Sequence, residues 1–366
     1  MKVMHIISGL RTGGAETQLR LLMRHSVTQA VAVALTNAEE VAKGIRDDGF
    51  QVFDLGMRTN HDVTALGRLA RLTAQQRPDV VHVHLYRATL YGRVAARLAG
   101  IPTVITTEHS VLDGEVEGRR TSASVKALYL GTEPLNTATI AVSDEVAARL
   151  ARWGVPARKL HVIPNGIEVG TALLTSPQAA ESRATLRKRL GIAPGAKLVG
   201  GIGRLHRAKR WDLLLQAVAD DLNEELHVML VGAGEEEAPL RTLIATLGIG
   251  SWVHMTGTMS DISFALAAMD LVVSSAPQET FGLAVVEAAA AGRPVVYVHS
   301  PGLDALGQLP GVTKVTAHPA SIRSAVLHAL HHPTVPPATA FDRYHISSTA
   351  RHVDRLYEQY RRKQYE

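Results

Sequence analysis

The sequence predicts an α/β fold of two Rossmann-like doubly wound domains, because strand-like and helix-like segments alternate in two separate series. In the first series, short apolar runs rich in β-branched residues read as strands, at residues 2–7, 30–35, 80–84, 103–107 and 139–142. Helical patterns lie between these strands, for example at residues 15–23, 63–75, 90–99 and 144–153. Repeated strand-then-helix units form a parallel sheet that is covered by helices on both faces.

The second series begins after a turn that marks the domain boundary. Pro164 and the Asn165-Gly166 pair signal this turn, and a stretch containing Thr, Ser and Pro follows at residues 170–182. We therefore expect an N-terminal domain over residues 1–164 and a C-terminal domain over residues 165–346. Strands of the second domain are expected at residues 197–203, 227–231, 252–255, 271–274 and 294–298. A charged helix is expected at residues 347–366.

The composition is that of a globular enzyme without cysteine chemistry. The 366 residues suffice for two domains of ordinary size, and the absence of cysteine excludes disulfides and thiolate metal sites. No run approaches the ~18 apolar residues of a membrane span, and the N-terminus does not read as a signal peptide, so a cytoplasmic location is expected. The net charge of +5 fits an anionic substrate or loose contact with an anionic membrane surface, and it is too diffuse to indicate nucleic-acid binding.

Two glutamates around a Phe281-Gly282 turn carry the strongest functional signal. The preceding apolar run reads as a buried strand and residues 283–291 as the helix that follows it. The N-terminus of such a helix lies at the carboxyl edge of the sheet, where its N–H groups attract a phosphate. Glu279 would face the group that this phosphate carries, and Glu287 could accept hydrogen bonds from a ribose diol. The alternative, a solvated Glu279 and an exposed Glu287, is disfavoured because the helix is small and apolar.

These residues resemble the retaining GT-B glycosyltransferases of family 4, which use nucleotide-sugar donors. The resemblance rests on two glutamates with seven residues between them, on the enclosed Phe-Gly pair, and on the Ala-x-Ala-x-Gly-x-Pro run that ends at Pro294. It implies two domains that face a cleft, a C-terminal helix that packs back on the first domain, and phosphate contacts from Phe281, Gly282 and Leu283. Residues 299–304 depart from the family, because many relatives have a Gly-Gly loop and a glutamate there.

A basic loop after the first strand of the second domain is the next candidate site. Arg204 and Lys209 follow a glycine-rich strand end and could neutralise a diphosphate as it leaves. A solvated basic loop is the alternative, and the resemblance favours the diphosphate role because the Gly-Arg-Leu-x-x-x-Lys pattern matches the family motif. A dinucleotide fingerprint is excluded, since its third glycine would fall on His206.

Candidate contacts in the first domain come from a glycine turn and from histidines. Gly14 lies between the first strand and the first helix, where a plain glycine turn competes with a phosphate contact; the resemblance favours contact with the donor phosphate. His82 and His84 point to one face of a strand, and we interpret them as structural. His109 follows a strand end, where a capping or loop role is the ordinary interpretation. The resemblance places it close to the transferred sugar.

Two neighbouring features are open to more than one interpretation. Glu108 could orient His109 or be a solvated neighbour. The helical segment 86–97 carries Arg87, Arg93 and Arg97, which could form either an acceptor-side surface or a solvated helical face.

Together with the family resemblance, these features predict a metal-independent retaining transferase that moves a sugar from a nucleoside-diphosphate sugar to a hydroxyl acceptor. The expected donor is a UDP-sugar, and the acceptor is a saccharide, a lipid-linked saccharide or a small molecule. Residues expected to act in catalysis are Glu279, His109, Arg204 and Lys209. Residues expected to bind the donor are Gly14, Arg204, Lys209, Phe281, Gly282, Leu283 and Glu287. The alternatives are a nucleotide-sugar epimerase or phosphorylase of the same fold, or a non-catalytic nucleotide-sugar-binding protein.

Overall fold

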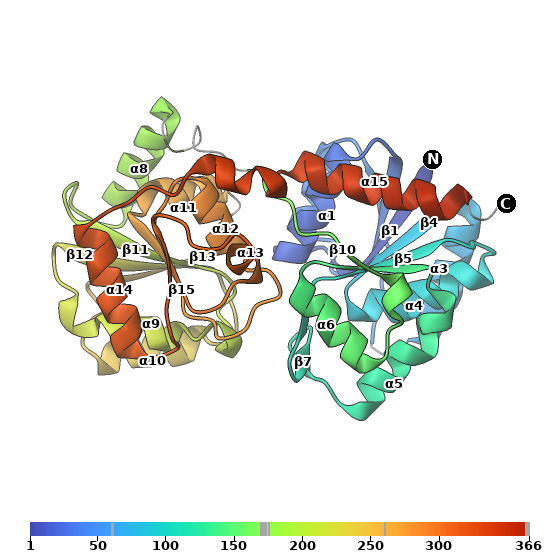
Figure 1. Ribbon diagram of the computed structural model, residues 1–366, viewed down its shortest axis with the longest axis horizontal. Helices are drawn as coiled ribbons and strands as arrows, with labels where there is room; N and C mark the ends of the chain where they lie inside the picture. Colours follow the sequence, from blue (N-terminus) through green and yellow to red (C-terminus); the bar gives the residue numbers. More distant parts are fainter. Residues whose placement is uncertain (60–61, 169–173, 175, 260, 363–366) are drawn as a thin grey trace. The chain divides into compact units, whose positions relative to one another are not determined.

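The computed structural model describes residues 1–59, 62–168, 174, 176–259 and 261–362 (Figure 1). The chain divides into two compact units, with Met1–Gly166 and Tyr344–Glu366 in unit 1 and Ile167–Arg343 in unit 2. The predicted boundary after residue 164 lies two residues before this division. Residues 169–173 and 175 of the predicted inter-domain stretch, and the last four residues of the predicted C-terminal helix, lie outside the described residues.

Unit 1 contains a parallel sheet in the order β10-β9-β5-β4-β1-β2-β3. Its strands, as far as the structure describes the chain, are β1 (Lys2–Gly9), β2 (Gln29–Thr36), β3 (Gln51–Asp54), β4 (Val80–His84), β5 (Val104–Glu108), β9 (Ala138–Ala141) and β10 (Leu160–Val162). This order is the doubly wound arrangement, in which the chain reverses direction across the sheet between β1 and β4. The predicted fold class is confirmed, and β3 and β10 are short edge strands that were not predicted.

Helices cover both faces of this sheet. Their bounds are α1 (Gly14–His25), α2 (Glu40–Asp47), α3 (Val63–Gln76), α4 (Tyr86–Leu98), α5 (Ala123–Thr132), α6 (Asp144–Trp153) and α15 (Ile346–Arg362). One core packs Met4, Ile6 and Val83 against α3 and α4, while Ile7 and Ala32 pack against α1 and α2 on the other face. A small antiparallel sheet of β6 (Val111–Leu112), β7 (Glu115–Val116) and β8 (Arg119–Arg120) follows β5.

Helix α15 packs on unit 1 beside α1 (Figure 1). It is strongly amphipathic, and its apolar side, including Val353, Leu356 and Tyr357, joins a core with Val3 and Ile105 of the sheet. The Tyr357 hydroxyl shares a 2.5 Å hydrogen bond with Nδ1 of His82, and both side chains are buried. The helix therefore contributes both apolar area and a buried polar contact.

Replacing Tyr357 with phenylalanine is expected to lower the free energy of unfolding by about 1–2 kcal/mol, because Nδ1 of His82 loses its partner inside the core. Tyr360→Phe is the matched control. Its hydroxyl bonds His161 at 3.0 Å in a partly exposed position, where water can replace it, so the loss should be smaller. Urea denaturation measures both values, and equal losses would contradict the assignment of Tyr357 as a buried anchor.

Unit 2 repeats the same topology with the strand order β13-β12-β11-β14-β15-β16. The strands are β11 (Lys197–Ile202), β12 (Leu226–Val231), β13 (Val253–Gly257), β14 (Leu271–Ser274), β15 (Val295–Tyr297) and β16 (Val312–Lys314). The helices in the described ranges are α8 (Pro177–Arg189), α9 (Trp211–Val218), α10 (Glu237–Thr246), α11 (Ile262–Ala268), α12 (Leu283–Ala290), α13 (Pro301–Asp304) and α14 (Pro319–His331). Helices α9, α10 and α14 lie on one face of the sheet, and α8, α11 and α12 on the other (Figure 1).

No helix in the described part of the chain has both the length and the apolar content needed to cross a bilayer.

Candidate active site

The strand order of unit 2 singles out one position for a ligand. In open parallel sheets, ligands bind beyond the carboxyl ends of the strands where the order reverses. In unit 2 this switch point lies between β11 and β14. The loop after β11 carries Arg204 and Lys209, and the loop after β14 carries Glu279 and Gly282. The predicted residues of the second domain therefore cluster at the switch point.

The loop after β11 is held close to the neighbouring loop after β12. The indole Nε1 of Trp211 donates to the Arg204 carbonyl at 3.1 Å, and the Leu205 N–H donates to the Ala233 carbonyl at 2.9 Å. Gly232 permits this approach, because a Cβ there would lie 2.0 Å from the Gly203 carbonyl oxygen. This glycine was not predicted, although its position directly after a strand was an available signal. The arrangement leaves the Arg204 side chain exposed beyond the sheet edge.

Lys209 and Glu279 join the two loops at the switch point. The Lys209 ammonium forms an ion pair and hydrogen bond with Oε1 of Glu279, and the two side chains are 28% and 15% exposed. Ser275 reinforces the junction, since its hydroxyl donates to the carbonyls of Lys209 and Arg210 at 3.0 and 2.7 Å. The sequence predicts four charged residues for this site. Within the described residues, an ion pair connects two of them, Lys209 and Glu279. Arg204 lies in the same loop as Lys209, and Glu287 lies in the helix that follows Glu279; within the described residues neither forms a hydrogen bond with that pair.

Helix α12 begins at the same edge. Gly282 is its N-cap, with φ at +85°, and Leu283 is its first residue. The hydroxyl of Ser300 donates to the Phe281 carbonyl at 2.9 Å and fixes the turn from the other side. The N–H groups of a first helical turn have no intrahelical acceptors, so they suit an anion at this edge.

Glu287 lies one turn inside α12 and is only partly exposed. Burial raises the pKa of its carboxyl to about 7, because few groups nearby compensate the ionised form. Hydrogen bonds from hydroxyl groups, such as those of a diol, would stabilise the ionised form of this carboxyl group.

In unit 1, the predicted Gly14 and His109 lie at the carboxyl edge of the other sheet. Gly14 is exposed and opens α1 after β1, and His109 directly follows β5. His109 Nε2 lies 3.3 Å from Nδ1 of His84, whose Nε2 lies 3.1 Å from Nδ1 of His5. Burial lowers the pKa of His109 to about 4, so its imidazole is neutral at pH 7. His109 is thus the outer end of a hydrogen-bonded row of imidazoles.

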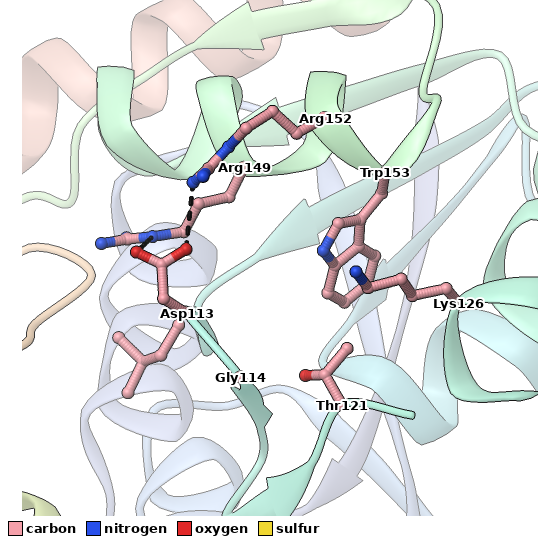
Figure 2. Close-up of a pocket in the computed structure, with 8 residues that line it drawn as sticks. Asp113, Gly114, Thr121, Lys126, Arg149, Arg152 and Trp153 are labelled. Carbon is pink, nitrogen blue, oxygen red and sulfur yellow. Dashed lines mark hydrogen bonds and ion pairs between the residues drawn. The ribbon is translucent and has the colours of Figure 1, made fainter. Parts of the chain in front are cut away.

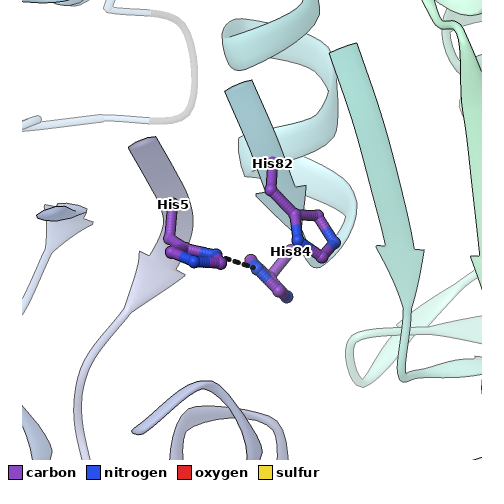
Figure 3. Close-up of side chains that lie close together, drawn as sticks. All are labelled: His5, His82 and His84. Atoms are coloured by element: carbon purple, nitrogen blue, oxygen red, sulfur yellow. Dashed lines mark hydrogen bonds between the residues drawn. The ribbon is translucent and has the colours of Figure 1, made fainter. Parts of the chain in front are cut away.

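The inner part of this row is a cluster of His5, His82 and His84, drawn in Figure 3. The histidines of β4 face one side of the sheet as predicted, and each has a nitrogen within 4.8 Å of the others. Both ring nitrogens of His82 already have protein partners, Tyr357 and Thr107. Burial lowers the pKa of all three imidazoles and favours their neutral forms. Metal ligation by all three would break a hydrogen bond of His82, which supports the structural interpretation.

The structure excludes the solvated alternative for Glu108, and it corrects the interpretation of the helical segment 86–97 at Arg93. Glu108 is fully buried, with its Oε1 3.5 Å from the Thr89 hydroxyl, and burial raises the pKa of its carboxyl to about 7; it is not a solvated residue. Arg93 is likewise buried and pairs with Glu133 at 2.9 Å, so it lies neither on an acceptor surface nor on a solvated face. Their partners are distant in sequence, which is why helical spacing alone placed Arg93 on the surface.

A further buried carboxylate, that of Glu117, was not predicted; it lies in the turn between β7 and β8 of the small antiparallel sheet. Its Oε1 accepts from the Ser8 hydroxyl at 3.2 Å, near the carboxyl end of β1, and burial raises the pKa of the carboxyl. Gly114 and Gly118 lie in the two turns that flank β7, and both have positive φ. The Gly-Glu-Val-Glu-Gly run was the available signal for a tight hairpin.

Comparison with known proteins identifies the family. The model of Glycosyltransferase Family 4 matches residues 12–170, and the model of Glycosyl transferases group 1 matches residues 182–321. A 2-deoxystreptamine glucosyltransferase of Streptomyces kanamyceticus is 27% identical over 287 residues, which span 74% of this chain and 72% of that protein. A D-inositol 3-phosphate glycosyltransferase of Catenulispora acidiphila is 31% identical over 252 residues, which span 62% of this chain and 57% of that protein.

Solved structures agree in fold. The structure of Anabaena Alr3699/HepE in complex with UDP and glucose superposes with a TM-score of 0.85 and 21% identity, covering 98% of this chain and 100% of that chain. Sucrose-phosphate synthase from Thermosynechococcus elongatus superposes with a TM-score of 0.78 and 17% identity, over 98% and 99% of the two chains. Together, the two family models and the two doubly wound sheets show that the chain belongs to the family 4 glycosyltransferases with the GT-B fold.

Proposed function

We propose that the protein is a retaining, metal-independent glycosyltransferase that uses a nucleoside-diphosphate sugar, a UDP-sugar first among the candidates. The observation that carries this proposal is the Lys209–Glu279 ion pair at the switch point of unit 2, beside Arg204 and the N-terminus of α12. Two cationic side chains and the N-terminus of a helix lie at one edge of the sheet. Their positive charge complements the negative charge of a departing diphosphate. The UDP bound in the Anabaena structure supports a uridine nucleotide as the donor.

In this proposal, Lys209 and Arg204 stabilise the diphosphate as the bond between the anomeric carbon and its oxygen breaks. The first-turn N–H groups of α12 contact the phosphate, and Glu287 accepts hydrogen bonds from the ribose. Glu279 orients Lys209 and accepts from hydroxyls of the sugar. The acceptor oxygen bonds the anomeric carbon on the face that the phosphate leaves, and its proton passes to the leaving phosphate oxygen, so the configuration is retained.

Gly14 and His109 contribute from unit 1, Gly14 to the phosphate and His109 to the transferred sugar. A neutral imidazole suits this role, since it can exchange hydrogen bonds with sugar hydroxyls without adding charge. The acceptor is a saccharide, a lipid-linked saccharide or a small molecule. The names of the two enzyme relatives include a cyclitol amine and an inositol phosphate, which supports a polar hydroxylated acceptor.

Replacing Glu287 with glutamine is expected to weaken UDP-sugar binding by about tenfold, because the charged hydrogen bond between the carboxylate and the ribose is lost.

The same substitution should stabilise the ligand-free protein at pH 8. The raised pKa means that the folded wild type holds a proton that the unfolded chain has lost, so its stability falls as the pH rises from about 4.5 to about 7. The glutamine variant lacks this fall. Urea denaturation at pH 5 and pH 8 and calorimetric titration measure the two effects.

Glu225→Gln is the control for Glu287→Gln, because Glu225 is an exposed carboxylate of the same unit. It should leave donor affinity unchanged. A Glu287→Gln variant that binds UDP-sugar as the wild type does would contradict the ribose assignment.

A thermal-shift screen with UDP-, GDP-, ADP- and dTDP-sugars tests the proposed function. A bound donor should raise the melting temperature by mass action, and we expect the largest rise with a UDP-sugar. Incubation of that donor with and without acceptors then separates the alternatives. Conversion of the donor sugar without any acceptor would indicate an epimerase, and binding without turnover of any kind would indicate a non-catalytic protein.

A further inference from the structure

Unit 1 contains a cationic pocket of about 240 Å³ that the proposed transfer site does not use (Figure 2). It lies between the small antiparallel sheet, the start of α5 and the second half of α6. Its lining residues include Asp113, Thr121, Lys126, Arg149, Arg152 and Trp153. This size is below that of a typical drug-sized site, ~300–1,000 Å³, and suits one small polar ligand.

The charged side chains of the pocket are predominantly cationic. Lys126, Arg149 and Arg152 line it against one carboxylate, that of Asp113. Asp113 lies 3.3 Å from Nε of Arg149 and 3.0 Å from an Nη of Arg152, and its side chain is 55% exposed. Arg149 is only 7% exposed and also pairs with Glu145 at 2.9 Å. An exposed carboxylate can turn to water, so an incoming anion with more negative charge could take its place between the guanidinium groups.

Two buried polar atoms in the pocket wall lack hydrogen-bond partners within the described residues. They are Nη1 of Arg149 and Oγ1 of Thr121. Figure 2 shows the Thr121 hydroxyl directed toward the middle of the pocket. Burial of an unpaired donor is unfavourable, and a ligand with several acceptor oxygens would satisfy both groups.

Trp153 supplies the apolar wall opposite the arginines (Figure 2). Tyr129 packs edge-on against its indole with ring centroids 5.7 Å apart, and the Lys126 ammonium lies 5.7 Å from the ring centroid. The indole is therefore fixed in place beside a cation. A carbon skeleton can pack on such a ring while an attached anion meets the basic groups.

We propose that this pocket binds the phosphoryl group of a phosphorylated saccharide, which is the acceptor of the transfer. The inference rests on the proposed function, and it names the acceptor class. The antiparallel sheet that forms one wall begins at Val111, two residues after His109, so the same segment connects the pocket with the residue assigned to the transferred sugar. The phosphoryl oxygens accept from Arg149, Arg152 and Thr121, and the sugar carbons pack on Trp153.

Fluorine NMR of protein labelled with 5-fluorotryptophan tests this binding directly. The chain has three tryptophans, and Trp153→Phe assigns the resonance of the pocket. Titration with glucose 1-phosphate should shift this resonance saturably. Glucose, and sodium chloride at matched ionic strength, should not.

Two substitutions in the pocket should act in opposite directions. Arg149→Gln should weaken glucose 1-phosphate binding at least tenfold, whereas Asp113→Asn should tighten it several-fold by removing the competing carboxylate. Arg158→Gln is the matched control, because Arg158 is an exposed arginine of unit 1 outside the pocket, and it should leave the affinity unchanged. Far-UV circular dichroism confirms that the variants are folded.

The proposal is overturned if glucose 1-phosphate gives no saturable shift, or if Arg149→Gln and Arg158→Gln behave alike. A shift produced by phosphatidylglycerol vesicles and not by glucose 1-phosphate would also overturn it, and would assign the pocket to a lipid headgroup. The thermal shift with UDP-sugar is measured on the same samples. If UDP-sugar still raises the melting temperature but the pocket does not bind glucose 1-phosphate, only this inference is rejected. If the pocket binds glucose 1-phosphate but UDP-sugar does not raise the melting temperature, the proposed donor is rejected instead.

Discussion

Replacing Lys209 with alanine is expected to lower turnover of the nucleotide sugar by about 10²- to 10³-fold, the range typical for removal of one charge-stabilising donor from an active site. The ammonium is the cation that faces Glu279 at the switch point of unit 2. Without it, the diphosphate would develop negative charge beside a carboxylate that is only 15% exposed. The defect should therefore appear in the bond-breaking step, which single-turnover measurements at saturating donor isolate.

Arg207→Ala is the control for Lys209→Ala. Arg207 belongs to the same short 3₁₀ turn, Arg207–Lys209, and is exposed, so its removal changes the net charge equally and should cost no more than about twofold because solvent screens it. The double variant Lys209→Ala with Glu279→Gln tests the role itself. Recovery of activity in the double variant would show that Lys209 only neutralises Glu279 and does not stabilise the diphosphate.

The sequence was sufficient to predict the central strands of both sheets, because each is a short, mainly apolar run followed by a helical pattern. The doubly wound topology then placed Arg204, Lys209, Glu279 and Gly282 at one edge of one sheet, since loops after parallel strands end on the same side. Edge strands such as β3 and β16 escaped prediction because they are short and only partly buried, so their patterns are weak.

Partner identities could not be predicted in the same way. Lys209 and Glu279 are 70 positions apart, and their contact depends on how two loops meet. Arg93 has the helical spacing of a surface residue. It is nevertheless buried, and it forms an ion pair with Glu133, which lies 40 positions later in the sequence. The pocket around Arg149 likewise depends on a hairpin whose two-residue strands leave almost no periodic signal.

Gly282→Ala is expected to lower the free energy of unfolding of unit 2 by about 2–6 kcal/mol, because two costs combine there. Gly282 has φ at +85°, which an alanine adopts only with strain of about 1–3 kcal/mol. A Cβ would also lie 2.3 Å from the Ser300 hydroxyl oxygen and 2.7 Å from its Cβ, and overpacking of this kind costs about 1–3 kcal/mol. Ser300 holds the Phe281 carbonyl, so the clash would displace the start of α12.

Gly307→Ala separates these two costs. Gly307 lies in the same unit with φ at +74°, and no atom lies within 4 Å of the position that a Cβ would occupy, so only the backbone strain applies. Urea denaturation should show that Gly282→Ala loses more stability than Gly307→Ala, and the difference measures the contact with Ser300. Equal losses would mean that Ser300 moves aside freely. In that case the turn that begins α12 would owe its shape to the backbone conformation of Gly282 rather than to its lack of a side chain.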